Sequence, residues 1–421
     1  MTTTTYRASQ FLEAARRLDV PVVVGSDREQ ALAAANPAGY LTLDFQEPER
    51  AAGAIVKFAE QYPIQAVVAA DDDGVILAAM AAAALGLPHN GIEAVIAARN
   101  KHRMREVLAA SGLPSPRFEI VSIDEDPHDV ARRVSLPCVV KPLFLSASRG
   151  VIRADNSAQL AAAFKRLSAL LRRPEVATQG GALAQQILVE TFIPGVEVAL
   201  EGLLLEGKLR LLALFDKPDP LEGPFFEETI YVTPSRLPAS LQQAIAACTE
   251  DAVRALGLQR GPVHAEFRLN DHGPWILEIA PRSIGGLCSR ALRFGEGVSL
   301  EELILRDAMG LEVASLERER QAAGVMMIPI PQAGVLREVR GQDEARRVRG
   351  IEEVRITIPV GQEVVPLPEG TRYLGFIFAR DETPDRVEAA LREAHQELIF
   401  HITPTGDRPE GIGCCSRESS S

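Results

Sequence analysis

The first ninety residues alternate between short apolar stretches typical of β-strands and longer Ala-rich stretches typical of α-helices. This alternation predicts a parallel sheet covered by helices, because parallel strands need a crossover connection between them. The first crossover helix is expected at 8–20, and only "MTTTTYR" precedes it, so the opening strand is expected to be short or missing. The remaining strands are expected at 20–27, 39–45 and 64–73, and the helices at 28–36, 47–62 and 74–87.

A different pattern, with paired strands and scattered helices, begins near Gly91. One helix is predicted from this residue, ended by Gly112 and Pro114. The stretch "EGK" at 206–208 separates two strand-like runs and predicts a hairpin over 196–219. Other expected elements are a strand, a small-residue loop and a strand over 137–156, helices at 157–172 and 237–258, a strand at 186–193, and a loop at 172–185.

The last hundred residues become strand-rich again. Strands are expected at 325–331, 352–359 and 372–381, followed by a helix at 383–400 and a polar Gly/Ser-rich end. These patterns divide the chain into an N-terminal α/β domain (1–90), a second domain (91–310), a small α+β domain (311–402) and a disordered tail (403–421).

Composition narrows the classes of partner. A formal net charge of -12 argues against general binding to nucleic acids or anionic membranes, although a local basic pocket for phosphate remains compatible with it. No apolar run reaches membrane-spanning length, and the N-terminus lacks a signal-peptide core. The five cysteines show no metal-ligand spacing and fit a reduced, cytoplasmic chain. We therefore expect small-molecule substrates.

The stretch "HAEFRLNDHGPWILEIAPRSIGG" predicts a hairpin that carries two acids in apolar surroundings. If Asn270 lies opposite Pro274, Glu266 pairs with Glu278, and the two-residue period of a strand puts both carboxylates on one face. Opposed like charges repel unless a cation or a proton lies between them, and two carboxylates plus substrate phosphates suit Mg²⁺. On the hairpin alone, a metal site and a solvated sheet face fit equally well.

A second motif, "VVKPLFLSASRGV", places Lys141 at a strand end before a loop of small residues and Arg149. Such a loop can present backbone N–H groups and Ser hydroxyls to phosphate oxygens while the two cations neutralise charge. It is not a Walker A sequence, and taken alone an exposed hairpin tip is the more frequent explanation of such a loop.

The order of these motifs is more specific than either one. A basic strand end, a Ser/Gly loop, "LVETFIPGVE", "AEF" and "LEIAPR" follow one another, and over roughly Gly91 to Gly310 the chain resembles the ATP-grasp superfamily. Within it, "FDKPDP", "EETIYVTPSRLP" and "EIAPRSIGGLCSRAL" are most similar to the biotin carboxylase-like carboxylate–amine ligases of the L-amino-acid ligase (dipeptide synthetase) group. The implied fold is an ATP-grasp fold, α/β and α+β, with a pre-ATP-grasp N-terminal domain and a small C-terminal domain.

The resemblance implies ATP and Mg²⁺ (or Mn²⁺) as cofactors and gives each matching residue a role. The implied phosphate contacts are Lys101, Lys141 and the loop residues Ser146, Ser148, Arg149 and Gly150. The implied adenine hinge uses backbone groups of Glu190, Thr191, Phe192 and Ile193, with Glu197 accepting the ribose hydroxyls. The implied metal ligands are Glu266 and Glu278. Arg282 and Lys141 are the expected catalytic residues, and Glu228, Arg282, Gly285 and Gly286 the expected substrate contacts.

Arg282 also stands out from the residues themselves. Gly285 and Gly286 let the backbone approach a ligand at the predicted start of a helix over 287–294, and a guanidinium beside helix-start amides suits a planar carboxylate. One position departs from the family: the common form is E-x-N-x-R, but Ala280 stands where the Asn would complete a two-metal site. A second metal ion is therefore in doubt.

Each assignment has a structural alternative. Lys101 fits an exposed helix lysine, Glu197 a strand edge, His264 a structural histidine, and Cys288 a small buried residue. Glu227, Glu228 and Arg236 fit either a substrate-reading loop or a solvated one.

The implied activity joins a carboxylic acid to an amine through an acyl phosphate, with a homodimer as the candidate assembly. This chemistry depends on positioning and charge neutralisation and needs no protein nucleophile. A carboxylase subunit acting on biotin and a non-catalytic ATP-binding module are the alternatives.

Overall fold

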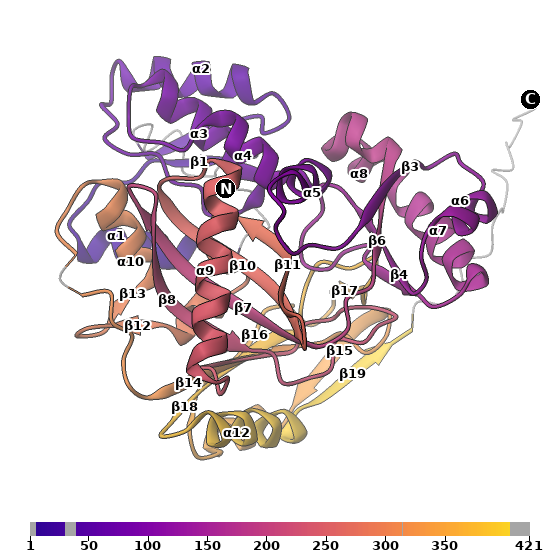
Figure 1. The fold of residues 1–421 in the computed structure, drawn as a ribbon. Coiled ribbons are helices and arrows are strands. Elements are labelled where there is room, and N and C mark those ends of the chain that lie inside the picture. Colours follow the sequence, from indigo (N-terminus) through magenta and orange to yellow (C-terminus); the bar gives the residue numbers. More distant parts are fainter. Residues whose placement is uncertain (1–5, 30–38, 314, 405–421) are drawn as a thin grey trace, which may run out of the picture.

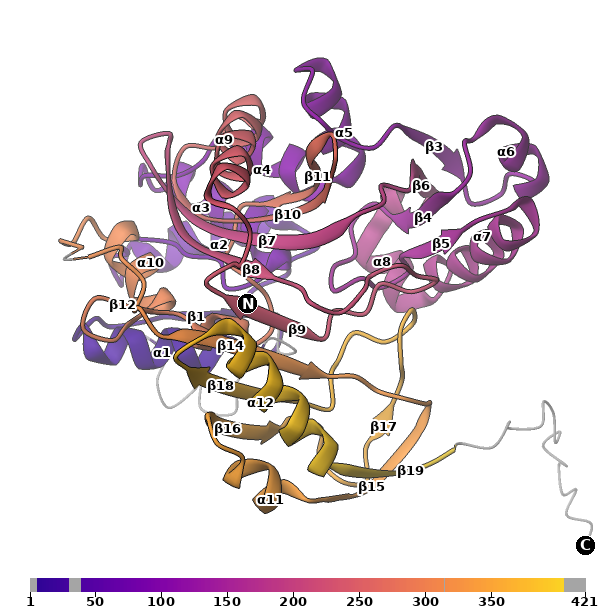
Figure 2. The ribbon, with the colours of Figure 1, turned by 60° about the horizontal axis from the view of Figure 1, so that its bottom comes forward.

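The computed structural model describes residues 6–29, 39–313 and 315–404. A sheet of eight strands runs through the middle of the molecule, in the order β11, β10, β7, β8, β9, β14, β18, β16 (Figures 1 and 2). Its strands are β7 (Val196–Leu205), β8 (Lys208–Asp216), β9 (Ile230–Thr233), β10 (Gly261–Asn270), β11 (Gly273–Ala280), β14 (Ala322–Ile328), β16 (Ile351–Ile356) and β18 (Gly375–Asp381). The helix α9 (Ala239–Leu256) packs on β8 and β11 and buries an apolar face there.

A smaller sheet, in the order β3, β6, β4, β5, forms a separate lobe. It consists of β3 (Phe118–Ser122), β4 (Cys138–Pro142), β5 (Ile152–Ala154) and β6 (Gln186–Thr191), and the helices beside it are α6 (Pro127–Arg133), α7 (Ser157–Leu171) and α8 (Pro174–Gly180). The expected loop at 172–185 is wrong, because α8 and a short 3-10 helix η2 (Gly181–Gln185) fill it. Pro174 is tolerated in the first turn of α8, where its missing N–H costs nothing.

The N-terminal region contains two parallel strands, β1 (Val24–Ser26) and β2 (Tyr40–Thr42), with helices α1 (Ala8–Arg17), α2 (Pro48–Ala59), η1 (Asp72–Gly74) and α3 (Val75–Ala84). Parallel pairing is confirmed. The strand expected at 64–73 is wrong, because η1 begins at Asp72 and residues 64–71 pair with no described strand. Most of the helix expected at 28–36 lies outside the described residues.

The helix expected from Gly91 is divided into α4 (Ile92–Arg99) and α5 (Lys101–Ala110). Asn100 adopts an extended conformation between them, and its side chain accepts hydrogen bonds from the N–H groups of His102 and Arg103. The cap starts a new helix in a new direction. This break is what places Lys101 at a helix start, against the smaller sheet.

The C-terminal region is not a separate appendix but continues the large sheet, because β14 pairs with β9 on one side and β18 on the other. The helix α12 (Pro384–Glu397) covers β14 and β18, and α11 (Gln342–Arg347) lies beside it. The expected helix to residue 400 ends early, since β19 (Ile399–Thr403) joins β15 (Gly334–Arg340) and β17 (Glu363–Val364) in a small sheet. Most of the predicted tail lies outside the described residues.

The predicted helix over 287–294 is also wrong. Only a 3-10 turn, η3 (Cys288–Ala291), forms there, and it leads into the two-stranded pair β12 (Arg293–Phe294) and β13 (Val298–Ser299) before α10 (Leu300–Ala308). No helix among the described residues is long and apolar enough to cross a membrane. Cys138, Cys248 and Cys288 are free and buried.

Candidate active site

A cavity of about 320 Å³ lies where the smaller sheet, the large sheet and the η1 loop meet. It is lined by residues from every part of the chain, from Tyr6 and Arg7 to Thr371 and Tyr373. Most of the predicted site residues line it: Lys101, Lys141, Ser146, Ser148, Glu190, Thr191, Phe192, Ile193, Glu197, Glu228, Glu266, Glu278, Arg282, Gly285 and Gly286. Arg149 and Gly150 do not.

In the glutamate hairpin, Glu266 lies opposite Glu278 as predicted, but the register at the turn differs from the prediction. Asn270 lies opposite Gly273, not Pro274, so the turn is one residue tighter than expected. A shift in register between Glu266 and Phe267 restores the alignment, and Glu266 pairs with Glu278 as predicted. A β-bulge of this kind is frequent beside active sites, where it redirects a side chain.

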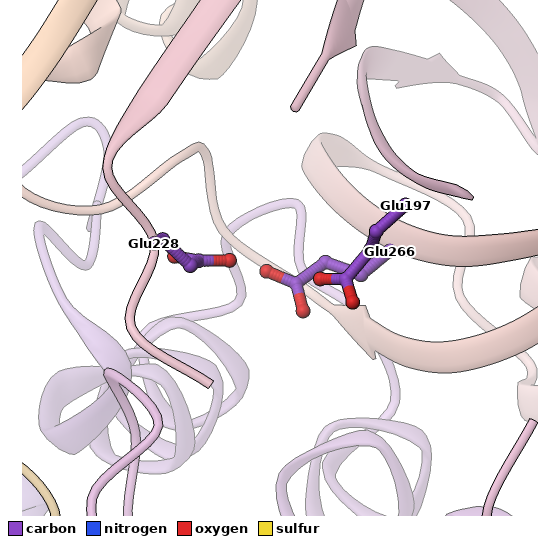
Figure 3. Close-up of side chains that lie close together, drawn as sticks. All are labelled: Glu197, Glu228 and Glu266. Atoms are coloured by element: carbon purple, nitrogen blue, oxygen red, sulfur yellow. The ribbon is translucent and has the colours of Figure 1, made fainter. Parts of the chain in front are cut away.

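Glu266 belongs to a carboxylate cluster with Glu197 and Glu228 (Figure 3), in which one oxygen from each residue lies within 4.8 Å of the other two. Glu197 comes from β7, Glu266 from the neighbouring β10, and Glu228 from the segment that enters β9, so the three acids converge from separate elements. Three hard oxygen donors at this separation can hold a divalent cation such as Mg²⁺.

Lys217 neutralises the carboxylate cluster from outside the cavity. Its ammonium group lies 2.7 Å from Glu197 Oε1 and 3.5 Å from Glu266 Oε1, and it donates a hydrogen bond to Glu228. Lys217 is 2% exposed and does not line the cavity. Burial alone would lower the pKa of Lys217, but the surrounding glutamates outweigh it and raise that pKa well above its ordinary value.

The acids of the cluster respond differently to burial. Burial raises the pKa of Glu228, and the nearby charges of Glu266 and Glu197 add to the rise. Burial also acts to raise the pKa of Glu266, but Lys217 and His264 outweigh it and hold that pKa well below its ordinary value. Glu266 is therefore ionised at neutral pH, as a metal ligand must be.

Glu278 lies apart from the cluster and faces the basic end of the cavity. Its Oε2 is 3.5 Å from the ammonium of Lys101, whose other contact is a hydrogen bond of 2.9 Å to the carbonyl of Leu145. Lys101 is buried rather than exposed, so the interpretation of it as a surface lysine is wrong.

His264 is a structural neighbour of the cluster. Its Nδ1 contacts Glu201, and its Nε2 lies 3.1 Å from Glu266 Oε1. Burial acts to lower the pKa of His264, but the two glutamates outweigh it and raise it to about 9, so the imidazolium form prevails at neutral pH. Ala280 lies directly opposite His264 in the hairpin and is buried. The methyl group there supplies no oxygen ligand.

The opposite end of the cavity is basic. Lys141 on β4 is 2.6 Å from Glu190 Oε2, and Arg105 on α5 is 2.6 Å from Glu190 Oε1, so two cations share one carboxylate. Burial lowers the pKa of Lys141 to about 8, although Glu190 opposes the shift. Burial would raise the pKa of Glu190, but Arg105 and Lys141 hold it below its ordinary value. A surplus of positive charge therefore remains here for an anion.

The loop 146–150 carries backbone suited to that anion. Ala147 and Ser148 have φ angles of 55° and 54°, and Gly150 has a φ of 76°. Non-glycine residues in this region are held by their surroundings at a cost, and consecutive N–H groups near such residues form concave anion sites. Arg149 points away, since its Nε donates to the carbonyl of Glu369. The structure therefore does not place Arg149 where a phosphate contact was predicted.

Phe192, one of the predicted adenine-hinge residues, lines the cavity. The guanidinium carbon of Arg153 lies 3.9 Å from the centre of its ring, and that of Arg268 lies 4.9 Å from it. Arg268 also contacts Glu197 Oε2 at 3.3 Å. Both oxygens of Glu197 thus already have cationic partners, and any ribose hydroxyl would share them.

Arg282 is held by a residue that the sequence analysis did not single out. Its Nη2 donates to Asp72 Oδ2 over 2.9 Å, which joins the large sheet to the N-terminal region. Gly286 has a φ of 60°, in the left-handed region that favours glycine, but η3 is too short to provide the expected helix-start amides. Burial acts to raise the pKa of Asp72, but Arg282 outweighs it and holds it below its ordinary value.

Other predicted alternatives are settled by position. Arg236 is turned outward and binds Asp216, Asp385 and Glu388, so it is not part of the cavity, and Glu227 does not line it either. Lys217 and Asp72 were missed. Both had a signal in the sequence: a Lys directly after a buried strand in "FDKPDP", and three acids before a helix in "DDDG".

Comparison with known proteins finds three matching domains. Residues 12–89 match the ATP-grasp N-terminal domain, 134–291 the ATP-grasp domain, and 326–403 the L-amino acid ligase C-terminal domain 2. The chain belongs to the ATP-grasp superfamily. A solved structure of an L-amino acid ligase from Bacillus licheniformis has 27% sequence identity and a TM-score of 0.79, and covers 94% of this chain and 96% of its own.

Two relatives in this superfamily are ligases by name. The alanine–anticapsin ligase of Bacillus amyloliquefaciens is 27% identical over 263 residues, which are 60% of this chain and 55% of that ligase. The D-alanine–D-alanine ligase of Aromatoleum aromaticum is 31% identical over 211 residues, 49% of this chain and 64% of that ligase. The chain thus spans between half and two thirds of each relative. The predicted fold and the predicted resemblance to L-amino acid ligases are confirmed.

Proposed function

We propose that the protein is an ATP- and Mg²⁺-dependent carboxylate–amine ligase that forms an amide bond between small acids and amines, amino acids in particular. The observation that carries the proposal is the polarity of one cavity: Lys101 and Lys141 line one end, and Glu197, Glu228 and Glu266 line the other. A triphosphate and a divalent cation need these two environments side by side.

The basic end would hold the phosphates, and the carboxylate cluster would hold the metal. Lys101, Lys141 and the N–H groups of 146–148 would contact the phosphate oxygens. Glu266 would hold Mg²⁺ from the carboxylate cluster, and Glu278 would hold it from the side of Lys101. The carboxylate cluster supports a further contribution from Glu228. When bound, Mg²⁺ neutralises charge on the phosphates.

The remaining residues would orient the acid. Arg282 lines the cavity next to Gly285 and Gly286, and an incoming carboxylate would share its guanidinium with Asp72. Attack of the acid oxygen on the γ-phosphorus would release ADP and give an acyl phosphate, which an amine would then capture with loss of phosphate. The names of the relatives, which include L-amino acid and alanine ligases, support amino acids as substrates.

The test is ADP release by purified protein over a panel of carboxylate and amine pairs. We expect release to require a carboxylic acid, and hydroxylamine to intercept the activated acyl group as a hydroxamate. A carboxylase would instead release ADP with bicarbonate and biotin and give no hydroxamate. That result would overturn the amide-ligase proposal.

A further inference from the structure

A loop of the C-terminal region reaches across to the phosphate loop. Residues 365–373, between β17 and β18, approach the smaller sheet beside α7 (Figure 2). The N–H of Gly150 donates to the carbonyl of Pro368 over 2.8 Å, and Arg149 Nε donates to the carbonyl of Glu369 over 3.0 Å. Two main-chain carbonyls of one loop therefore fix the back of the other.

The side chain of Glu369 secures this contact. Its two oxygens accept hydrogen bonds from Arg166 on α7, at 2.5 Å to Nε and 2.8 Å to Nη2. This bidentate geometry is the strongest form of carboxylate–guanidinium pairing. Burial acts to raise the pKa of Glu369, but Arg166 outweighs it and holds it below its ordinary value, so the carboxylate is ionised at neutral pH. The guanidinium also lies 4.9 Å from the ring centre of Phe225, which orients it.

The turn that presents Glu369 is tightly built. The N–H of Gly370 donates to the carbonyl of Pro366 over 2.9 Å, and a Cβ at residue 370 would lie 1.9 Å from the carbonyl oxygen of Val365. Three residues further on, Tyr373 lines the cavity. The same short loop thus touches the phosphate loop at one end and the cavity at the other.

We propose that Glu369 is a positioning residue of the nucleotide site, which through Arg166 and the carbonyls of 368 and 369 keeps the phosphate loop folded over the bound triphosphate. The loop 146–150 must move aside for the nucleotide to leave, and the bonds to Pro368 and Glu369 must then break. The C-terminal region therefore sets how fast the nucleotide dissociates. This proposal rests on the proposed function only in taking ATP as the ligand of the cavity.

The test uses the full chain and the fluorescent probe mant-ATP with Mg²⁺. The dissociation rate, measured by stopped-flow chase with unlabelled ATP, should rise about two- to five-fold in Glu369→Gln, the range expected for a partly exposed ion pair. Arg166→Gln should give the same rise, and the double variant no further rise, because both changes remove one interaction.

Glu338→Gln is the matched control, since Glu338 pairs with Arg340 at 2.8 Å in the same region but does not touch the loop. We expect wild-type dissociation in that variant. An unchanged rate in Glu369→Gln, or an equal rise in Glu338→Gln, overturns the positioning role and leaves the proposed function standing. Absence of mant-ATP binding by the wild-type protein overturns both. Binding with the expected rise, but without acid-dependent ADP release, supports the positioning role and counts against the ligase proposal alone.

Discussion

Two buried lysines on either side of one cavity differ in their surroundings. Lys141 shares a single carboxylate, Glu190, with Arg105, whereas Lys217 contacts the three carboxylates of Glu197, Glu228 and Glu266. The pKa of Lys141 falls to about 8 and that of Lys217 rises well above its ordinary value, although burial acts to lower both.

The difference shows that burial alone does not decide the direction in which the pKa of either lysine shifts. The number of carboxylates in contact with each lysine does: one for Lys141, which Arg105 shares, and three for Lys217. In both places a cation outside the cavity wall pairs with acids that line it: Arg105 with Glu190, and Lys217 with the carboxylate cluster.

The largest expected effect comes from removing the cation at the acidic end. Lys217→Met removes the cation that pairs with the buried Glu228 and one cationic partner each of Glu197 and Glu266, which should lower the free energy of unfolding by about 3–5 kcal/mol in urea titrations. Added Mg²⁺ should recover more stability in this variant than in the wild type, because it would replace the missing cation. A loss below about 1 kcal/mol would show that the acids are already protonated or solvated.

The hairpin tests the metal site through turnover. Glu278→Gln keeps the shape of the side chain but removes its charge, so ADP formation should fall by more than about 100-fold while the fold persists. Circular dichroism and the exposed variant Glu338→Gln serve as controls. Near-normal turnover at saturating Mg²⁺ would remove Glu278 from the metal site and leave the carboxylate cluster as the candidate.

At the basic end, Lys141→Met should weaken Mg-ATP binding by about 10- to 150-fold, the equivalent of the roughly 1.5–3 kcal/mol of a charge-assisted hydrogen bond. Calorimetry measures it directly. Lys165→Met, an exposed lysine on α7, is the matched control and should bind normally. Equal affinities in the two variants would contradict the phosphate role.

The smallest expected effect is the uptake of a proton when ATP binds. Because the pKa of Lys141 is about 8 in the free protein, its ammonium loses its proton as pH rises through that value, and ATP affinity should fall above it. Because a bound phosphate favours the charged form of Lys141, the binding of ATP at pH 8 should take up roughly half a proton. Calorimetry in buffers of different ionisation enthalpy measures the uptake, which Lys141→Met should abolish. Proton release in the wild type would contradict the assignment.

The sequence predicted those features that depend on local pattern. The pairing of Glu266 with Glu278 followed from two strand-like runs and a turn, and Lys141 followed from a strand end before a small-residue loop. The register shift that leaves Leu277 of β11 as an extra residue could not be predicted, since the pattern of the two runs carries no signal for it. The position of Lys217 among acids from three elements is equally a tertiary fact.

The errors have physical causes too. Asn100 breaks a helix that periodicity alone would continue, because its side chain caps the next one. The turn at η3 replaces a helix because the chain must enter β12 at once. Residues 365–373 gave no signal at all, since their role lies in main-chain carbonyls that any sequence carries.

The strand β14 has a consequence for how such proteins diversify. The match to the L-amino acid ligase C-terminal domain begins at residue 326, inside β14, whose neighbours β9 and β18 come from either side of that boundary. Cutting the chain there would leave the buried residues of β9 as an open edge, a template for aggregation. A C-terminal region taken from another ligase would have to supply a strand that pairs with β9. The boundary of the family match and the boundary of the folded sheet therefore fall at different places in this chain.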